Sequence, residues 1–166
     1  MRNLIAVPVI LLAVLLQSAI VSRVTLLNGM ADLPMVMLAA WAMQDEVETA
    51  WQWALALGIL VGFVSGLSWV VPLLSYLLVI VLAQVLQRRI WQAPLLAMFS
   101  ITFLGTIGLS FFSLIALRLS GIALSITDVF GLLTLPGILL NMLLAIPVFA
   151  IMRDLAQWVY PALEAE

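Results

Sequence analysis

Charged side chains are scarce in this chain, and their positions constrain its fold more than any other feature. The 166 residues include six basic and eight acidic side chains, 8% of the chain, where an ordinary soluble domain carries about 25%. An ionised side chain at the centre of a bilayer costs about 2.5–3.5 kcal/mol, so uncharged stretches of about 20 residues predict transmembrane helices. The charge-free stretches are 3–22, 33–44, 49–87, 90–117 and 129–152.

Composition excludes several classes of protein. Hydrophobic residues make up 66% of the chain, too many for a soluble domain, whose surface must be wetted by polar side chains. Cys, His and Lys are absent, which excludes disulfides, thiolate or imidazole metal sites, Ser-His-Asp triads and Schiff bases. A net charge of −2, with Arg88-Arg89 as the longest basic run, argues against nucleic-acid binding. We therefore expect a membrane protein that is not an enzyme, with no catalytic residue, cofactor or metal site.

The charge-free stretches predict an all-α integral membrane protein with six transmembrane helices in a single polytopic domain over residues 1–166. The stretch 49–87 is too long for one span, and Gly66 and Pro72 mark a turn that divides it into a hairpin. A helix over 30–44 rises only about 22 Å against a hydrocarbon core of about 30 Å, so this segment is a short or tilted span, or a re-entrant helix. The expected helices are about 4–22, 31–44, 51–67, 72–87, 93–117 and 129–152.

Orientation is predicted from the arginines, because cytoplasmic loops carry an excess of Lys and Arg. With six spans and a cytoplasmic N-terminus, four arginines lie inside the cell and two, Arg23 and Arg118, lie outside. Both termini are then cytoplasmic. Indole rings prefer the membrane interface, and the tryptophans all lie within a few residues of a predicted helix end: Trp41, Trp51, Trp53, Trp69, Trp91 and Trp158.

A ridge of small residues lies on the predicted third helix, where Gly58, Gly62 and Gly66 follow one another at a spacing of four. Small residues at this spacing let a neighbouring helix approach backbone to backbone. This neighbour is either the next helix of the same hairpin or a helix of another protein. The ridge is our candidate contact surface.

Further candidates for specific contacts are Asp32, Asn141 and Pro136. Asp32 precedes an apolar helix, as does Asp128, and we expect each carboxylate to cap the helix that follows. Asn141 lies near the middle of the last helix and must find a polar partner inside the bundle or across an interface. Pro136 and Pro147 predict a bent last helix with freed carbonyl groups.

Methionines cluster around the short second segment, where Met35 and Met37 lie within the expected helix. Flexible thioethers fill irregular gaps in a core, and they also suit adaptable binding surfaces. We favour gap filling. The alternative is that this short helix is a mobile element or faces a partner.

Short motifs follow one another in a characteristic order. Gln17 stands late in the first helix, Asp32-Leu33 opens the second, and the glycine ridge occupies the third. The complete order is Leu16-Gln17-Ser18, Gly29, Asp32-Leu33, Gly58-x-x-x-Gly62-Phe63-x-x-Gly66-Leu67, Arg88-Arg89, Leu135-Pro136, Leu140-Asn141 and Pro147. Over nearly its whole length the chain thus resembles the MreD family of rod-shape-determining membrane proteins. It departs from that family at Ala31, where members often have Pro, at Ser68-Trp69, where they often have an acidic residue, and in the acidic loop at 44–50.

The resemblance implies a non-enzymatic component of the cell-elongation machinery in the bacterial inner membrane. It implies binding to MreC, support for RodA and a class B penicillin-binding protein in peptidoglycan synthesis, an indirect link to MreB, and contact with membrane lipids. It also implies a fold similar to the S-components of energy-coupling-factor transporters. The alternative function is such a substrate-binding S-component for a vitamin or micronutrient, which needs a pocket of convergent polar groups. The predicted outside loops offer little beyond Asn28, Asp32, Arg118 and Asp128.

Overall fold

The computed structural model describes residues 6–45, 47–66, 68–89, 93–122 and 124–160. Within them the chain is almost entirely helical, which confirms the all-α prediction for this part of the protein. The elements in chain order are α1 (Ala6–Ala19), a 3-10 turn η2 (Val21–Arg23), β1 (Thr25–Leu26), β2 (Gly29–Met30), α2 (Leu33–Ala42), α3 (Ala50–Val64), α4 (Val70–Arg89), α5 (Pro94–Leu119), α6 (Ile126–Asp128), a π-helical stretch η3 (Val129–Thr134) and α7 (Leu135–Val159).

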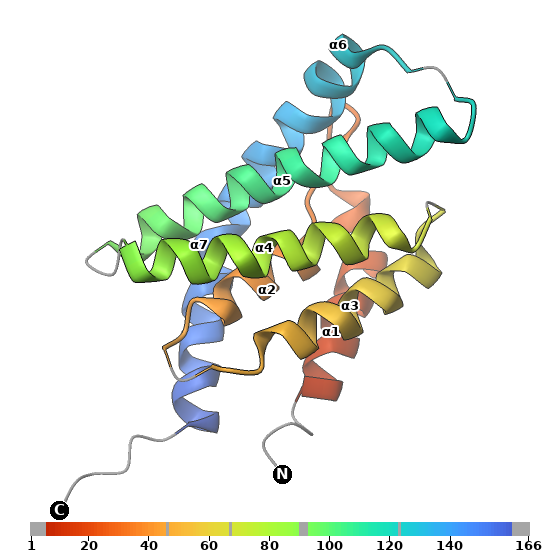
Figure 1. Cartoon of the computed structure of the whole chain (residues 1–166). Coiled ribbons are helices and arrows are strands. Elements are labelled where there is room, and N and C mark those ends of the chain that lie inside the picture. Colours follow the sequence, from red (N-terminus) through yellow and green to blue (C-terminus); the bar gives the residue numbers. More distant parts are fainter. Residues whose placement is uncertain (1–5, 46, 67, 90–92, 123, 161–166) are drawn as a thin grey trace, which may run out of the picture.

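The helices run back and forth across the molecule (Figure 1). The elements α3, α4 and α5 lie side by side, and α1 and α7 are steeper in this view. The chain turns after α1, α3 and α5 towards the upper right of Figure 1, whereas the loop after α2 and the end of α4 lie towards the left. Successive helices therefore traverse the bundle in opposite directions, as expected for a polytopic arrangement.

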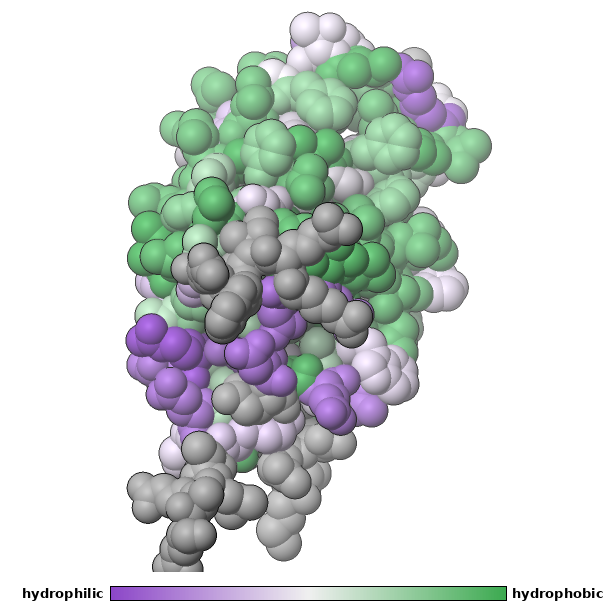
Figure 2. All heavy atoms as spheres, turned by 60° about the vertical axis from the view of Figure 1, so that its left-hand side comes forward, coloured by the Kyte–Doolittle hydropathy of each residue, from purple (hydrophilic) through white to green (hydrophobic). Residues whose placement is uncertain are grey.

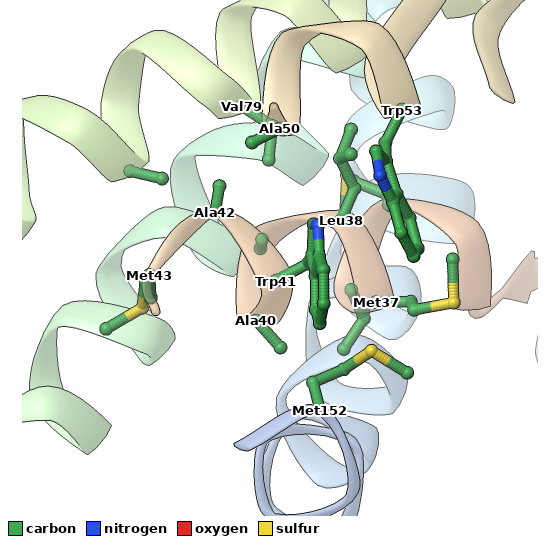
Figure 3. Packing of buried hydrophobic residues seen from close by; sticks show 14 of the residues in the cluster. Met37, Leu38, Ala40, Trp41, Ala42, Met43, Ala50, Trp53, Val79 and Met152 are labelled. Atoms are coloured by element: carbon green, nitrogen blue, oxygen red, sulfur yellow. The ribbon is translucent and has the colours of Figure 1, made fainter. Parts of the chain in front are cut away.

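The short helix α2 is the centre of the bundle. It contacts α1, α3, α4, α5 and α7, and every residue from Pro34 to Ala42 is buried. An apolar side-chain surface on all sides is what a fully surrounded helix requires. Figure 3 shows its side chains packed among those of the neighbouring helices. Met35 and Met37 are 0% and 3% exposed, so they fill the core, and the alternative that this helix faces a partner is wrong.

Two tryptophans belong to this core. Trp41 on α2 and Trp53 on α3 are buried, and their rings stack with centroids 4.5 Å apart (Figure 3). Both lie near helix ends, as expected, but their rings face the interior of the bundle because α3 packs against α2 at this point. The tryptophans at other helix ends that the structure describes are exposed, and they are Trp51, Trp69 and Trp158. Trp91 lies outside the described residues.

Three helical stretches are long and apolar enough to cross a membrane, and they are Val70–Gln87, Pro94–Leu119 and Ile126–Val159. The other helices are shorter in the described residues, where α2 has 10 residues, α3 has 15 and the described part of α1 has 14. These lengths correspond to rises of about 15, 22 and 21 Å, below the hydrocarbon thickness of about 30 Å. Among the described residues, three helices and not the expected six therefore have the length of a full span. The predicted start of the first helix at about residue 4 and the predicted cytoplasmic position of Arg2 concern residues outside the described part of the chain.

The surface is predominantly apolar. In Figure 2 hydrophobic residues cover most of the visible face, and hydrophilic residues gather towards its lower end. Large side chains such as Phe63, Leu119 and Leu143 project outward with 84%, 84% and 71% of their area exposed. Soluble monomers rarely expose so much contiguous apolar surface. This surface suits contact with lipid or with other membrane helices.

Candidate functional site

The candidate site is built around Asp32, the residue that precedes α2. Its Oδ1 accepts a hydrogen bond from the backbone N–H of Met35 at 2.9 Å, so the predicted cap of this helix is confirmed. The hydroxyl of Tyr76 on α4 donates to the same carboxylate and lies 3.1 Å from Oδ1 and 3.2 Å from Oδ2. Both oxygens of Asp32 thus act as acceptors, and the carboxylate ties the start of α2 to α4.

Asn141 links the same point to α5 and α7. Its Oδ1 accepts from the backbone N–H of Asp32 at 2.7 Å, and its Nδ2 donates to Oγ1 of Thr106 at 2.9 Å. Thr106 in turn donates to the backbone carbonyl of Thr102 at 2.7 Å. Asn141 is 1% exposed, so these bonds offset the cost of burying its amide. The polar partner that the sequence required lies inside the bundle.

The amide of Gln17 adds α1 to this arrangement. Its Nε2 donates to the carbonyl of Ala31 and its Oε1 accepts from the N–H of Leu33, each at 2.9 Å. These bonds satisfy backbone groups on both sides of Asp32, just before α2 begins. We refer to the connected side chains as the polar network, which joins five helices and consists of Gln17, Asp32, Tyr76, Thr106 and Asn141.

The β1–β2 hairpin packs against the start of α7 at Pro136. Because proline has no N–H, the carbonyl of Leu132 cannot receive the usual hydrogen bond from four residues further on. It accepts a hydrogen bond from the backbone N–H of Asn28 at 3.2 Å. The carbonyl that Pro136 was predicted to leave free therefore anchors the hairpin. The helix is irregular at this point, because the π-helical stretch η3 ends at Thr134, two residues before Pro136.

Gly29 allows the hairpin to approach this closely. A Cβ at Gly29 would lie 2.6 Å from the carbonyl oxygen of Leu133 and 2.8 Å from the nitrogen of Gly137. Both are backbone atoms that cannot move aside without displacing the helix. The approach of the hairpin to α7 therefore depends on glycine at this position.

A cavity of about 320 Å³ lies against the polar network, between α5, the start of α7 and the hairpin. Thr106 and Asn141 are buried at its deep end, and Asp32 also lines it. Asn28 and Leu124 are exposed at its rim. The outside loops were expected to offer little pocket chemistry, and of their polar residues Asn28 and Asp32 do contribute. Their partners in the cavity come from α5 and α7.

The glycine ridge is largely used inside the molecule. A Cβ at Gly58 would lie 2.8 Å from Cα of Leu73, and one at Gly62 would lie 2.8 Å from Cα of Trp69. Gly58 therefore lets α3 approach the backbone of α4, and Gly62 lets it approach the turn at Trp69 that leads into α4. This is the intramolecular alternative. Gly66 follows the end of α3, and a Cβ there would meet nothing within 4 Å.

The cap predicted at Asp128 is wrong. Asp128 lies inside the helical region that begins at Ile126, and its side chain forms no cap hydrogen bond. The helix starts three residues earlier than the charge pattern indicated, with Ser125 in the capping position. Asp128 therefore contributes no contact to the candidate site.

Tyr76 is the member of the polar network that sequence reasoning missed. The available signal was a tyrosine inside an otherwise apolar predicted span, because a buried phenol needs a hydrogen-bond partner. Gln17 was noted only as part of a motif, and its contact with the residues before α2 depends on how α1 packs. Such pairings depend on tertiary structure.

The chemistry available to the polar network is limited to hydrogen bonding and one carboxylate. Among the described residues, no group of three or more His, Cys, Asp or Glu side chains is placed to hold a metal ion. The network can hold five helices in one packing and present an acceptor to the adjoining cavity. No family model, curated protein or solved structure matches this chain.

Proposed function

We propose that this protein is a non-enzymatic scaffold of the cell-elongation machinery in the bacterial inner membrane. In this proposal it binds MreC and supports peptidoglycan synthesis by RodA and a class B penicillin-binding protein, with MreB linked indirectly. In this proposal all six main helices, α1 to α5 and α7, pass through the bundle in alternating directions, including those too short to span a bilayer alone, so both termini are cytoplasmic. The fold is proposed to be similar to that of the S-components of energy-coupling-factor transporters. The proposal rests on the motifs that resemble the MreD family and on their placement in the fold.

The observation that carries this proposal is the meeting of the motif residues at one point. Gln17, Gly29, Asp32, Pro136 and Asn141 come from three separate parts of the sequence. They lie together where α1, the hairpin, α2 and α7 join, and hydrogen bonds or close backbone contacts connect them. The packing of each of these residues depends on the others. Their joint occurrence in one chain therefore supports the resemblance to the MreD family more strongly than any single motif does.

The surface also supports a scaffold. The described part of the chain has short loops and an apolar exterior, so it would recognise other proteins through helix faces and turns. Gly58 and Gly62 are occupied by α4. Contacts with partner helices therefore fall to outward faces such as that of Leu139 and Leu143 on α7, which are exposed.

A substrate-binding component of a transporter is the second candidate function, and the cavity beside Asp32 favours it. Such a component needs polar groups that converge on a pocket from several elements. Asp32, Thr106 and Asn141 meet this requirement from α2, α5 and α7. The two functions make different predictions about which proteins accompany the chain.

The test is to purify the tagged full-length protein from its own host in mild detergent and to identify what accompanies it. We expect MreC, RodA and the penicillin-binding protein. Asn141→Leu should lower MreC recovery several-fold at equal expression, because the junction of α1, α2 and α7 loosens. Thr134→Val is the matched control, since Thr134 is equally buried and bonds only its own helix. Recovery of an ATPase-driven transporter core without MreC would refute the scaffold and support the second candidate.

A further inference from the structure

The cavity beside the polar network is elongated along α5. Its lining residues on α5 run from Thr106 to Leu117, which corresponds to a rise of roughly 16 Å along the helix. Its volume of about 320 Å³ lies within the range of small-molecule sites. The length and the volume together suit a small molecule with an extended alkyl chain.

The lining combines apolar walls with a polar deep end that carries one acidic group. Leu109, Leu114 and Leu117 of α5 line the walls together with Val129. Among the described residues, Asp32 is the acidic lining residue, and no arginine lines the cavity. An occupant is thus surrounded by apolar side chains along its length and meets a carboxylate near one end.

The hydrogen bonds of the polar network leave acceptor capacity at that end. The Asp32 carboxylate receives the Met35 N–H and the Tyr76 hydroxyl, whereas an ionised carboxylate has about four lone-pair sites. Thr106 Oγ1 uses its own hydrogen towards Thr102, so towards the cavity it can only accept. The deep end therefore favours a group that carries several donors and a positive charge, which describes an ammonium group.

We propose that this cavity binds a slender amphiphile with a protonated amino group, its ammonium placed at Asp32 and its alkyl part along the leucines of α5. Charge-assisted hydrogen bonds are roughly twice as strong as neutral ones. An alcohol of the same length makes only neutral bonds at the deep end, and a carboxylate of that length is repelled by Asp32. The inference goes beyond the proposed scaffold function.

Two other cavities show that the acidic group distinguishes this one. One lies between α4 and α5 and is lined by residues such as Leu74 and Ala116. The other lies between α1, α2 and α7 and is lined by residues such as Leu16 and Met37. Neither has a charged residue among the described side chains that line it. They serve as internal references for binding that depends on apolar volume alone.

The test uses the purified full-length protein in nanodiscs of uncharged lipid, with empty nanodiscs as the reference. The probes are octylamine, 1-octanol and octanoate, and binding is followed by calorimetry and by the shift in Tm. Octylamine is expected to bind saturably and to raise Tm, 1-octanol to bind about tenfold more weakly, and octanoate to show no saturable binding. Equal binding of octylamine and 1-octanol, or no saturable octylamine binding, would overturn the proposal.

Two variants locate the site. Ser113→Leu fills this cavity, and Ala116→Leu makes a similar enlargement three residues further on, in the cavity shared with α4. Octylamine binding should be lost in the first and kept in the second. Asp32→Asn keeps the side-chain size and an oxygen that can cap α2, and it should abolish the preference for octylamine over 1-octanol. Unchanged octylamine binding in Ser113→Leu, or an unchanged preference in Asp32→Asn, would contradict the assignment. Because no partner protein is present, this result is independent of the copurification test.

Discussion

Replacing Asn141 by Leu is the perturbation that tests the polar network most directly. Leucine has a similar size and no hydrogen-bonding group, so it removes the bonds to Asp32 and to Thr106 together. Hydrogen bonds between membrane helices contribute about 0.6 kcal/mol on average and about 1.7 kcal/mol at most. The substitution also leaves the Asp32 N–H buried without a partner, which costs about 1–3 kcal/mol. We expect the free energy of unfolding to fall by about 2–3 kcal/mol.

A double-mutant cycle with Thr106→Val isolates one of these bonds. Each single variant already removes the Asn141–Thr106 hydrogen bond, so the double variant should be less destabilised than the sum of the two by about 0.6–1.7 kcal/mol. Thr134→Val is the control and should change stability little, because its hydroxyl bonds only to the carbonyl of Val129 on the same helical stretch.

The measurement is reversible unfolding in mixed micelles, followed by far-UV circular dichroism and by tryptophan fluorescence, to which the stacked Trp41–Trp53 pair contributes. These two probes should report the same transition midpoint, since α2 and α3 carry the pair at the centre of the bundle. The reasoning is refuted if Asn141→Leu is no less stable than Thr134→Val, or if the two single effects add without coupling.

Three further substitutions have defined outcomes. Gly58→Ala places a Cβ 2.8 Å from Cα of Leu73 and should lower the free energy of unfolding by about 1–3 kcal/mol. Gly66→Ala is the control and should leave stability unchanged. Thermal unfolding compares the two variants, and equal Tm values would contradict the packing of α3 on α4. Gly29→Ala should separate the β1–β2 hairpin from α7. Gly131→Ala is the control and should leave the hairpin in place, because a Cβ there meets nothing within 4 Å. We expect faster proteolysis around residues 24–31 in Gly29→Ala alone. Tyr76→Phe removes one donor from the Asp32 carboxylate and should lower the free energy of unfolding by about 1–2 kcal/mol, and an unchanged denaturation midpoint would argue against that bond.

Several local features were predictable because they depend on neighbouring residues. The start of α2 follows from Asp32 and the proline in its first turn. The turn that divides α3 from α4 follows from the break in the apolar pattern near Gly66. The carbonyl that Pro136 leaves free follows from the missing N–H. Each of these depends on a few residues close in the sequence, so propensity and pattern are sufficient.

Other features were not predictable because they depend on residues far apart in the sequence. The scarcity of charge predicts that Trp41 and Trp53 lie near helix ends, yet the ends of α2 and α3 lie beside other helices, and the rings stack in the core. The same applies to Asn141, whose partners Asp32 and Thr106 are 109 and 35 residues away. Helix lengths were overestimated at α2 and α3 because an uncharged residue can continue an apolar stretch without continuing a helix.

The sequence by itself determined that the chain is helical, apolar on its surface, and without the side chains needed for thiol, imidazole or amine chemistry, because each of these properties follows from composition and from the spacing of charges. Only the tertiary structure decided that α2, with 10 residues, is the centre of the bundle. Only the structure showed that three helices in the described part of the chain, and not six, have the length to cross a membrane. It also placed Asp32 beside Tyr76 and Asn141. A buried polar group needs a hydrogen-bond partner, but the cost of burial does not specify which group that partner is. The packing of five helices around α2 determines which polar groups lie within hydrogen-bonding distance.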